Sequence, residues 1–345
     1  MKIALITIYE PITNLGSFLQ CYAMKSFLES CGHNVTIIEK VPLKELIGKK
    51  LLSLNPKRAF FLRVKKCWYT YKDLKRLNRL NHTKWDPSAF DCVIYGSDEI
   101  WNLHNKYFAD DLFWGVNVNV PKIAYAISVG HMTQIEFDEY NNYQKAANNF
   151  KVVFARDKRT YEMLYQYSNL HRKLVCDPTM LIPLNKMSLP IKLPLKKYLL
   201  VYTYGLSSNH ITLVKEYARK HNLIIVSPCF WHIWADKVIE CSALQFSTLI
   251  ANAECVFTTT FHGAIFTMLN HKKCCIFSQR DKVKDVVDTL GVNQHLISSN
   301  CTIEQFSRTI ELEFPTLTFE SKLEEIRKYS QNVIKKEISK LKYIK

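Results

Sequence analysis

The segment from Thr258 to Gly263 has the residue types in this sequence that are best suited to chemistry. A short β-branched run leads into a loop that carries His262, and Gly263 opens an expected helix with no acidic residue in its first turn. A helix N-terminus presents backbone N–H donors and the positive end of a dipole, and an imidazole exchanges protons near neutral pH. The segment therefore predicts an anion pocket with an acid/base group at its rim. The simpler interpretation is a capped helix with a hydrogen-bonded histidine.

Basic residues follow two other expected strands. Ligands of open α/β sheets bind beyond the carboxyl ends of the strands, so residues at those ends are candidates for a site. Arg156 directly follows a strand, where a guanidinium suits a carboxylate or phosphate, unless it forms a surface ion pair with Asp157. Arg280 and Lys282 follow a later strand and border the same end of the sheet, unless they lie in a solvated loop.

Acidic residues and glycines occupy similar positions. Asp98 and Glu99 follow a Gly-Ser turn after a strand, where they could act as a base, bind a sugar hydroxyl or cap a helix. Four of the nine glycines, at positions 16, 96, 130 and 263, lie in such loops, which suggests tight turns or close approach to a ligand. The sequence has no Walker A loop, GxGxxG, HExxH or nucleophile elbow, and no metal-ligand spacing, so we expect no metal.

Alternating strand and helix patterns predict an α/β protein with two Rossmann-like lobes facing a cleft, followed by a C-terminal helix. Strands are expected at 2–8, 35–38, 92–95, 122–127, 152–155, 174–176, 198–202, 223–226, 255–258 and 274–277. Helices are expected at 18–28, 134–150, 161–167, 211–221, 246–252, 263–269 and 283–290. We expect an N-terminal lobe over 1–182, a linker over 183–197, a C-terminal lobe over 198–315 and a terminal helix over 316–345 that crosses back to the N-terminal lobe.

The positive charge of the chain is concentrated in one block. Residues 41–84 hold 13 Lys and Arg and two acidic residues, out of a total net charge of +16. Two amphipathic pieces, 43–54 and 60–80, predict that this block is a helical insertion in the N-terminal lobe. The charge indicates an anionic partner, such as nucleic acid, a membrane surface or a phosphorylated substrate; a solvated helical face is the alternative.

The composition of the chain indicates the cell compartment in which the protein is found. No run reaches the roughly 18 apolar residues of a spanning helix, and the N-terminus does not resemble a signal peptide. The eleven cysteines are odd in number and lack CxxC spacing, which is typical of reduced thiols in a cytoplasmic protein.

An ordered set of motifs resembles those of the polysaccharide pyruvyl transferase family. Residues 14–23, Asn-Leu-Gly-Ser-Phe-Leu-Gln-Cys-Tyr-Ala, resemble its Asn-x-Gly-x-x-Leu-Gln-x-Tyr-Ala, and residues 96–102, Gly-Ser-Asp-Glu-Ile-Trp-Asn, resemble its Gly-Ser-Asp-Gln-Ile-Trp-Asn. Thr-Phe-His-Gly at 260–263 is similar to its Ser-Phe-His-Gly. Similar segments also occur at 124–130, 155–157 and 177–179.

The resemblance implies a GT-B-like fold and transfer of the pyruvyl group of phosphoenolpyruvate to two hydroxyls of a sugar, which makes a cyclic ketal. It also implies that His262, Arg156 and Arg280 serve the donor. We expect His262 to be the general acid/base and the arginines to clamp the anionic donor. The remaining expected donor-site residues are Thr259, Thr260, Gly263 and Lys282. No cofactor is implied beyond phosphoenolpyruvate as the donor substrate.

On the acceptor side, Asp98 is expected as a second catalytic group or a hydroxyl ligand. The expected acceptor-binding residues are Asn14, Gly16, Gln20, Ser97, Glu99, Trp101 and Asn102. Two positions depart from the family pattern. Some branches carry an arginine where this chain has Thr260, so one donor-binding cation is missing or supplied elsewhere, and Glu99 replaces a glutamine.

Two other function classes stay open. A GT-B glycosyltransferase that uses a nucleotide sugar would share the architecture, although the second lobe has no Glu-rich ribose motif. A nucleic-acid binder would explain the charge, but no nucleic-acid motif is present, and we expect no nucleic-acid partner. We expect a glycan or lipid-linked oligosaccharide acceptor from capsule or exopolysaccharide synthesis. The expected location is cytoplasmic, with 41–84 docking on the anionic inner face of the membrane.

Overall fold

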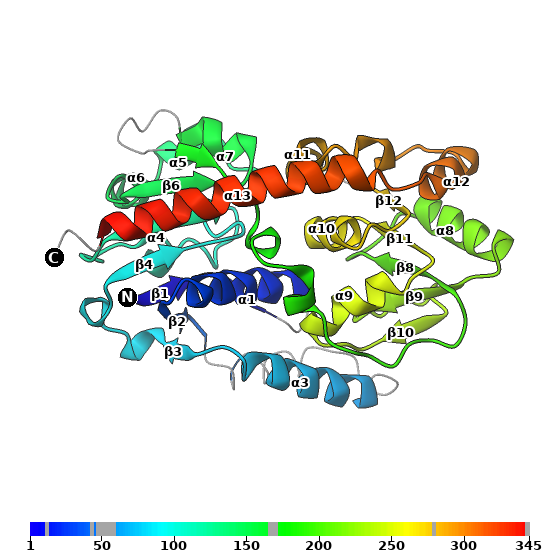
Figure 1. The fold of residues 1–345 in the computed structure, drawn as a ribbon, viewed down its shortest axis with the longest axis horizontal. Coiled ribbons are helices and arrows are strands. Elements are labelled where there is room, and N and C mark those ends of the chain that lie inside the picture. The colour runs from blue at the N-terminus through cyan, green and yellow to red at the C-terminus, as the bar shows by residue number, and fades with distance from the viewer. Residues whose placement is uncertain (11–13, 42–44, 46–59, 165–171, 278–280, 342–345) are drawn as a thin grey trace.

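In the computed structural model the strands form two parallel sheets, one in each half of the chain (Figure 1). The structure describes residues 1–10, 14–41, 45, 60–164, 172–277 and 281–341. The first sheet has the order β3 (Arg79–Asn81), β2 (Asn34–Glu39), β1 (Lys2–Ile6), β4 (Cys92–Tyr95), β5 (Lys122–Ile127), β6 (Val152–Ala155) and β7 (Arg172–Leu174). The second has the order β10 (Lys237–Ile239), β9 (Ile224–Pro228), β8 (Tyr198–Tyr202), β11 (Cys255–Thr258) and β12 (Cys274–Ile276).

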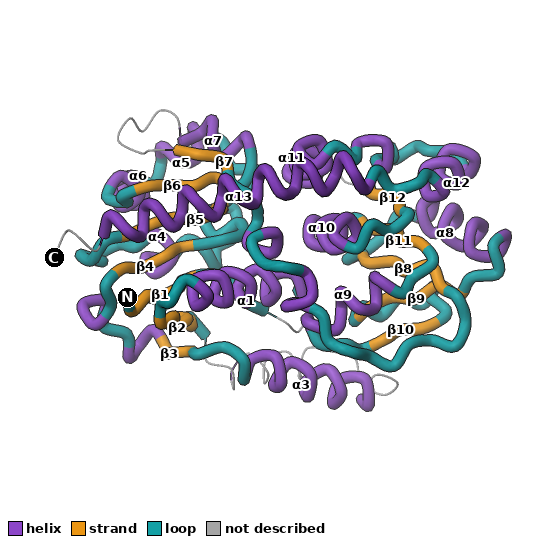
Figure 2. The backbone as a smooth tube through the Cα atoms, in the orientation of Figure 1, coloured by secondary structure: helices purple, strands orange, loops and turns teal. Residues whose placement is uncertain are grey.

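Helices cover the faces of both sheets (Figure 2). In the N-terminal lobe they are α1 (Leu15–Ser30), α3 (Phe60–Leu74), α4 (Asp111–Trp114), α5 (Gln134–Asp138), α6 (Asn141–Asn148) and α7 (Lys158–Met163). In the C-terminal lobe they are α8 (Ser208–Lys220), α9 (Ala243–Ala251), α10 (Phe261–Leu269), α11 (Asp281–Leu290) and α12 (Ile303–Glu311), and α13 (Thr316–Leu341) follows. The predicted α/β fold with two Rossmann-like lobes and a C-terminal helix is confirmed.

The central strands are short apolar runs because the helices leave neither face of the sheets in water. Every residue of β4, β5, β6, β8 and β11 is buried. Loops beyond the carboxyl ends of these strands carry the polar residues. Gly32, at a φ of +81°, follows α1 in the left-handed region, which is the helix-ending role expected of a glycine.

Helix α13 runs across both lobes (Figure 1). Its first turns contact the C-terminal lobe, where Glu320 Oε1 lies 2.7 Å from His271 Nε2. Its middle contacts the N-terminal lobe, because Ser330 Oγ accepts a hydrogen bond of 3.0 Å from Cys176 N and Arg327 Nε donates one of 2.7 Å to Met180 O. The two lobes are therefore joined by this helix as well as by the chain between β7 and β8.

Three local predictions are wrong. The helix expected over 60–80 ends at Leu74, and part of its remainder forms the edge strand β3. The helix expected over 134–150 is divided into α5 and α6 by Tyr140, whose φ of −108° and ψ of 62° are not helical. Neither β3 nor β10 was expected, because a strand of three residues is too short to show a hydrophobic period. The piece expected over 43–54 lies outside the described residues, apart from Glu45.

Within the described part of the chain, no helix combines the length and the apolar character needed to cross a membrane. All eleven cysteines are unpaired, and most of them are buried. They are part of the packed interior, as expected for reduced thiols.

Candidate active site

A cleft lies between the carboxyl ends of the two sheets. It encloses about 420 Å³. The N-terminal lobe contributes Asn14, Asp98 and Glu99 to its wall. The other side is formed by loops after β8 and β11, by the start of α10 and by Lys282 in the first turn of α11. This is the position at which parallel sheets bind ligands, and it is shared by both lobes.

His262 is the second residue of α10, and its imidazole lines the cleft. The helix begins at Phe261, two residues earlier than predicted, so the histidine belongs to the first turn itself. Its Nε2 atom lies 3.7 Å from Asp177 Oδ2 and has no hydrogen-bond partner among the described residues. Only 8% of the side chain is exposed. The imidazole is thus held against a carboxylate while one edge faces the cavity.

Gly16 explains how the histidine fits against the N-terminal lobe. A Cβ atom at this position would overlap the imidazole of His262. Gly16 therefore lets the first turn of α1 pack directly on the ring, and its role is to make room for His262. The expected contact of Gly16 with the acceptor stays a prediction, and Gly16 is not among the residues that line the cleft.

Asp177 follows β7 in a short 3-10 turn and is fully buried. Its Oδ1 accepts hydrogen bonds from Thr179 N at 3.1 Å and Thr179 Oγ1 at 2.8 Å, and its Oδ2 accepts one from Arg156 at 3.2 Å. Burial raises the pKa of Asp177, but His262 and Arg156 lower it more strongly, and the net result is a pKa well below its usual range. Asp177 is therefore a fixed anion facing His262.

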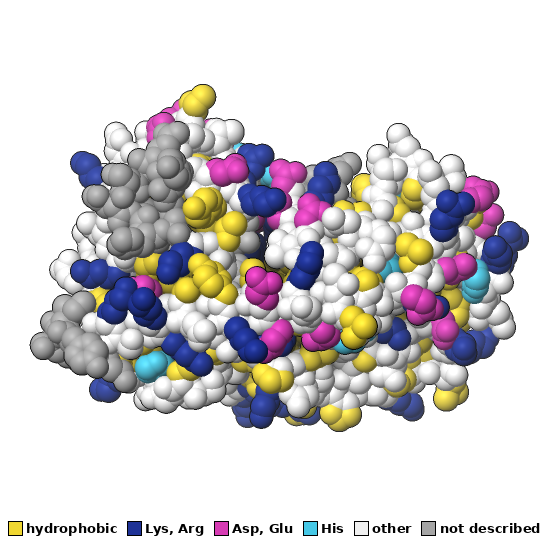
Figure 3. All heavy atoms as spheres, turned by 45° about the horizontal axis from the view of Figure 1, so that its top comes forward, with side chains coloured by type: hydrophobic (Ala, Val, Ile, Leu, Met, Phe, Trp, Pro, Cys, Tyr) yellow, Lys and Arg dark blue, Asp and Glu magenta, His cyan; other side chains and the backbone are white. Residues whose placement is uncertain are grey.

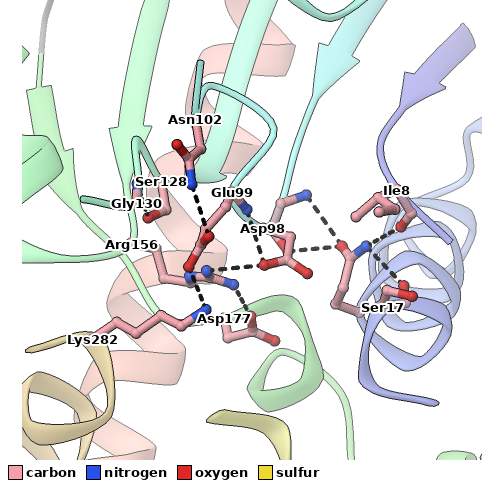
Figure 4. A network of polar contacts seen from close by, with 12 residues as sticks. Ile8, Ser17, Asp98, Glu99, Asn102, Ser128, Gly130, Arg156, Asp177 and Lys282 are labelled. Carbon is pink, nitrogen blue, oxygen red and sulfur yellow. Dashed lines mark hydrogen bonds and ion pairs between the residues drawn. The ribbon is translucent and has the colours of Figure 1, made fainter. Parts of the chain in front are cut away.

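Arg156 links two carboxylates rather than lining the cleft. It donates hydrogen bonds of 3.2 Å to both Asp98 and Asp177, and its guanidinium lies 4.5 Å from the centre of the Phe261 ring (Figure 4). Its side chain is 2% exposed. The alternative of a surface pair with Asp157 is wrong, because the side chain is buried between Asp98 and Asp177. The expected clamp of Arg156 on the donor stays a prediction.

Asp98 lies at the wall of the cleft with a φ of 75°, beside Arg156. Burial raises the pKa of its carboxyl group, but the charges of Arg156, Lys282 and His262 outweigh burial and lower the pKa to about 2. A carboxylate with so low a pKa is a weak proton acceptor near neutral pH. Asp98 is therefore better suited to accept a hydrogen bond from a hydroxyl than to act as a base.

Glu99 and Lys282 form a second pair at the rim of the cleft. Lys282 Nζ lies 2.6 Å from Glu99 Oε1, and Asn102 Nδ2 donates a hydrogen bond of 3.2 Å to Glu99 Oε2 (Figure 4). Burial raises the pKa of Glu99, while Lys282 lowers it, with a lowered pKa as the outcome. Among the described residues that line the cleft, Lys282 is the permanent cation.

The threonines before α10 shape its N-terminus. Thr260 caps the helix by accepting a hydrogen bond of 3.0 Å from Gly263 N, and Thr259 Oγ1 lies 2.7 Å from Thr203 Oγ1. Both Thr259 and Thr260 line the cleft. Gly263 is not among the lining residues, and its N–H is bonded to Thr260, so its expected role in donor binding stays a prediction.

Three predicted acceptor residues, Gln20, Ser97 and Trp101, are wholly buried and do not line the cleft, so their contact with the acceptor stays a prediction. Gln20 joins β1 to the loop after β4, since its Nε2 donates 2.6 Å to Ile8 O and its Oε1 accepts 2.7 Å from Ser97 Oγ. Trp101 stacks on Trp114 at 4.9 Å. Of the remaining predicted residues, Asn14 and Glu99 line the cleft, Asn102 supports Glu99, and Arg280 lies outside the described residues.

The role of Asp177 was not predicted. Residues 177–179 resemble a segment of the family, but the sequence gives Asp177 no partner. That His262 faces Asp177 depends on how the two sheets meet, and no pattern within one lobe records it. Among the residues that the structure describes, no group of three or more His, Cys, Asp or Glu side chains could hold a metal ion.

Comparisons with known proteins place this geometry in context. Residues 14–281 match the family model described as polysaccharide pyruvyl transferase. None of the curated proteins matches the chain. Among solved structures, a putative UDP-N-acetylglucosamine 2-epimerase from Listeria monocytogenes is similar over 97% of this chain and 94% of its own, with 9% identity and a TM-score of 0.52.

Two further solved structures have the same arrangement. The UDP-GlcNAc 2-epimerase from Methanocaldococcus jannaschii has 13% identity and a TM-score of 0.51 over 96% of this chain and 99% of its own. A spinosyn forosaminyltransferase has 8% identity and a TM-score of 0.51 over 99% of both chains. At such low identity, these likenesses show that the fold is of the GT-B type.

Proposed function

Because the chain belongs to the polysaccharide pyruvyl transferase family, we propose that it moves the pyruvyl group of phosphoenolpyruvate onto two hydroxyls of one glycan sugar, forming a cyclic ketal. The observation that carries the proposal is the position of His262. Its imidazole lines a cleft shared by both lobes and is backed by the Asp177 carboxylate at 3.7 Å. A histidine oriented by a buried carboxylate is a common arrangement for proton transfer.

In the proposed reaction His262 donates a proton to the methylene carbon of phosphoenolpyruvate, so that positive charge develops at C2. One sugar hydroxyl attacks C2, the bond from C2 to the phosphate oxygen breaks, and phosphate leaves. A second hydroxyl of the same sugar then closes the ketal. Two C–O bonds form and one breaks, and the protons of both hydroxyls balance the proton gained by carbon and the proton carried by phosphate.

The donor is a carboxylate and a phosphate, so its site needs cations and N–H donors. Thr259, Thr260 and the first residues of α10 line the cleft, and we assign the hydrogen-bond donors of the site to their hydroxyl and N–H groups. We assign the cation to Lys282, which would leave Glu99 when the donor binds. That exchange would free Glu99 to accept a hydrogen bond from the sugar, beside the ionised Asp98.

The test is a reaction of the purified protein with phosphoenolpyruvate and a panel of free and lipid-linked glycans. We expect one glycan to gain the mass of one pyruvyl ketal, with one inorganic phosphate released for each ketal formed. Phosphate release without a modified glycan, or no reaction with any glycan, would count against the proposal.

A nucleotide-sugar glycosyltransferase is the second candidate, because the similar structures include a glycosyl-group transferase and epimerases named for a nucleotide sugar. Thermal-shift measurements with phosphoenolpyruvate and with nucleotide sugars separate the two. Stabilisation by phosphoenolpyruvate alone favours pyruvyl transfer, since a ligand stabilises only the fold that binds it.

We also propose that the protein works at an anionic membrane surface, where a lipid-linked acceptor would be presented on the cytoplasmic side. The support comes from α3. Val64, Trp68 and Tyr71 are 52%, 54% and 41% exposed and recur at helical spacing along one side. Lys72 lies 4.8 Å from the Trp68 ring, and Lys75 lies 4.6 Å from the Tyr71 ring.

The opposite side of α3 is occupied by the C-terminal lobe. Asp73 is the acidic residue of this helix, and its Oδ2 accepts a hydrogen bond of 2.6 Å from Ala243 N, so it is turned away from the exposed stripe. On the face shown in Figure 3, by contrast, basic and acidic side chains are interspersed. Exposed aromatic rings flanked by lysines without acids suit the headgroup region of an anionic bilayer.

A further inference from the structure

A second cavity opens from the main cleft and has no part in the proposed transfer step. It encloses about 250 Å³ and shares Ile8, Asn14 and Asn105 with the cleft. It lies beyond the carboxyl ends of β1 and β2 and beside β3, on the outer half of the first sheet. A ligand in the main cleft could therefore extend into it without crossing any strand.

Three polar side chains form one wall of this side cavity. Glu39, at the end of β2, accepts a hydrogen bond of 2.9 Å from the Tyr9 hydroxyl and one of 2.8 Å from Arg79. Both contacts use Oε2, and only 13% of the Glu39 side chain is exposed. Burial and the neighbouring Glu39 carboxylate raise the pKa of Tyr9 well above its usual range, so its hydroxyl stays protonated.

The opposite wall is aromatic. Tyr107 is 37% exposed and lines the cavity. Its ring is held by Lys40, whose Nζ lies 4.4 Å from the ring centre and 2.8 Å from both Tyr107 O and Asp110 Oδ2. Lys40 therefore contacts both the ring and the backbone of Tyr107.

Both cations of the side cavity are already paired. Arg79 is paired with Glu39, Lys40 is paired with Asp110, and Glu10 adds a further carboxylate to the lining. An anion such as a phosphate would find no uncompensated cation here, while an apolar ligand would have to cover the carboxylate and the guanidinium. A neutral polyhydroxyl ring fits both walls, because vicinal hydroxyls pair with planar polar groups and the C–H face of a sugar packs on an aromatic ring.

We propose that this side cavity binds the neutral sugar unit next to the one that receives the pyruvyl group. The acceptor would then be read as a disaccharide or longer glycan, with Tyr107 and Glu39 recognising the second unit. This inference rests on the proposed function, because it takes the main cleft as the place where the modified sugar lies.

The test compares paired glycans for binding and for turnover. The probes are methyl β-galactoside with methyl β-lactoside, and methyl N-acetyl-β-mannosaminide with its β-linked disaccharide containing N-acetylglucosamine. Affinities are measured by saturation-transfer NMR for the wild-type protein, for Tyr107→Ala and for Glu39→Gln. The control Glu29→Gln removes an exposed carboxylate paired with Lys25, away from both cavities.

We expect one disaccharide to bind the wild-type protein about tenfold more tightly than its monosaccharide, as one aromatic contact with its hydrogen bonds allows. Tyr107→Ala and Glu39→Gln should remove this preference and leave monosaccharide affinity unchanged, while Glu29→Gln keeps the preference. Equal binding of both members of every pair, no binding, or a preference that survives both variants would overturn the subsite.

Turnover in the same samples separates the two proposals. Adding phosphoenolpyruvate and following ketal formation by mass spectrometry reports on the reaction alone. If the disaccharide preference depends on Tyr107 and Glu39 but no ketal forms, the reaction is wrong and the glycan subsite stands. If ketals form, but each variant keeps the wild-type ratio of the rate on the disaccharide to the rate on the monosaccharide, the subsite is wrong and the reaction stands.

Discussion

The Asp177 carboxylate and the His262 imidazole face each other across the junction of the two lobes, with Oδ2 and Nε2 3.7 Å apart. Asp177 follows a strand of the first sheet, and His262 belongs to a helix that follows a strand of the second. Arg156 and Thr179 hold the carboxylate from behind. The pair therefore exists only where the lobes meet, and it ties the chemistry of the cleft to their relative position.

We expect Asp177→Asn to lower kcat, because the amide keeps the size of the side chain but removes the negative charge that faces His262. A loss of about tenfold to a hundredfold is expected, smaller than the roughly 10²–10⁴-fold loss for His262→Ala. Turnover is followed by phosphate release and ketal mass, and folding by circular dichroism. The control His221→Ala alters an exposed histidine paired with Glu311 and should leave kcat unchanged. Near-normal turnover of His262→Ala would remove the assignment of this residue as the acid.

Gly16→Ala tests whether the histidine needs the space that this glycine leaves. The added Cβ would overlap the imidazole, so we expect lower turnover and a loss of about 1–3 kcal/mol in the free energy of unfolding. If the overlap with the ring is the cause, most of this loss should disappear in a Gly16→Ala, His262→Ala double variant. Additive losses in the double variant would place the cause elsewhere.

The Asp98 carboxylate makes the free energy of unfolding of the protein depend on pH in the acidic range. Its pKa of about 2 in the folded state lies below the value of about 3.9 for an unfolded chain, so it stabilises the fold above pH 4. That contribution is lost as the pH falls from about 4 toward 2. Asp98→Asn should cost about 3 kcal/mol near neutral pH, because Arg156 loses a partner, and should flatten the acid limb of the stability curve.

Urea unfolding at a series of pH values measures this effect. The exposed carboxylate of Asp288, on α11, provides the control, and Asp288→Asn should reproduce the wild-type pH dependence. An unchanged acid limb in Asp98→Asn would show that this carboxylate does not carry the dependence.

The stripe on α3 predicts binding to vesicles that contain phosphatidylglycerol. We expect flotation of the wild-type protein at low salt, and a loss of binding in Trp68→Ser, Tyr71→Ser, because buried aromatic rings and about 1 kcal/mol per lysine near the surface hold the helix there. Replacing Lys72 and Lys75 by serine should weaken binding further, whereas replacing the exposed Lys215 and Lys220 of α8 should not. Absence of wild-type binding at low salt would eliminate this surface as a membrane contact.

The fold and half of the cleft could be predicted because they depend on local patterns. Apolar runs marked the long strands, and polar residues after them marked Asp98, Glu99 and His262. What the sequence could not provide is burial. Arginine and tryptophan side chains occur both in ligand sites and inside proteins, so the sequence does not distinguish the two cases. The packing of β4 to β7 shows that Arg156 and Trp101 are enclosed.

Two helices that cross between the lobes also limit how this protein can be divided. Helix α13 fastens the C-terminal lobe to Cys176 and Met180, and α3 reaches from the N-terminal lobe to the start of α9, where Asp73 accepts a hydrogen bond from Ala243 N. Neither lobe is therefore a module that could be exchanged by itself. A transplanted C-terminal lobe would lose the hydrogen bond from Ala243 N to Asp73, and an isolated N-terminal lobe would expose the surface on which α13 rests. A recombinant protein designed to act on a different substrate must therefore keep α3 and α13 together with the lobe surfaces that they contact.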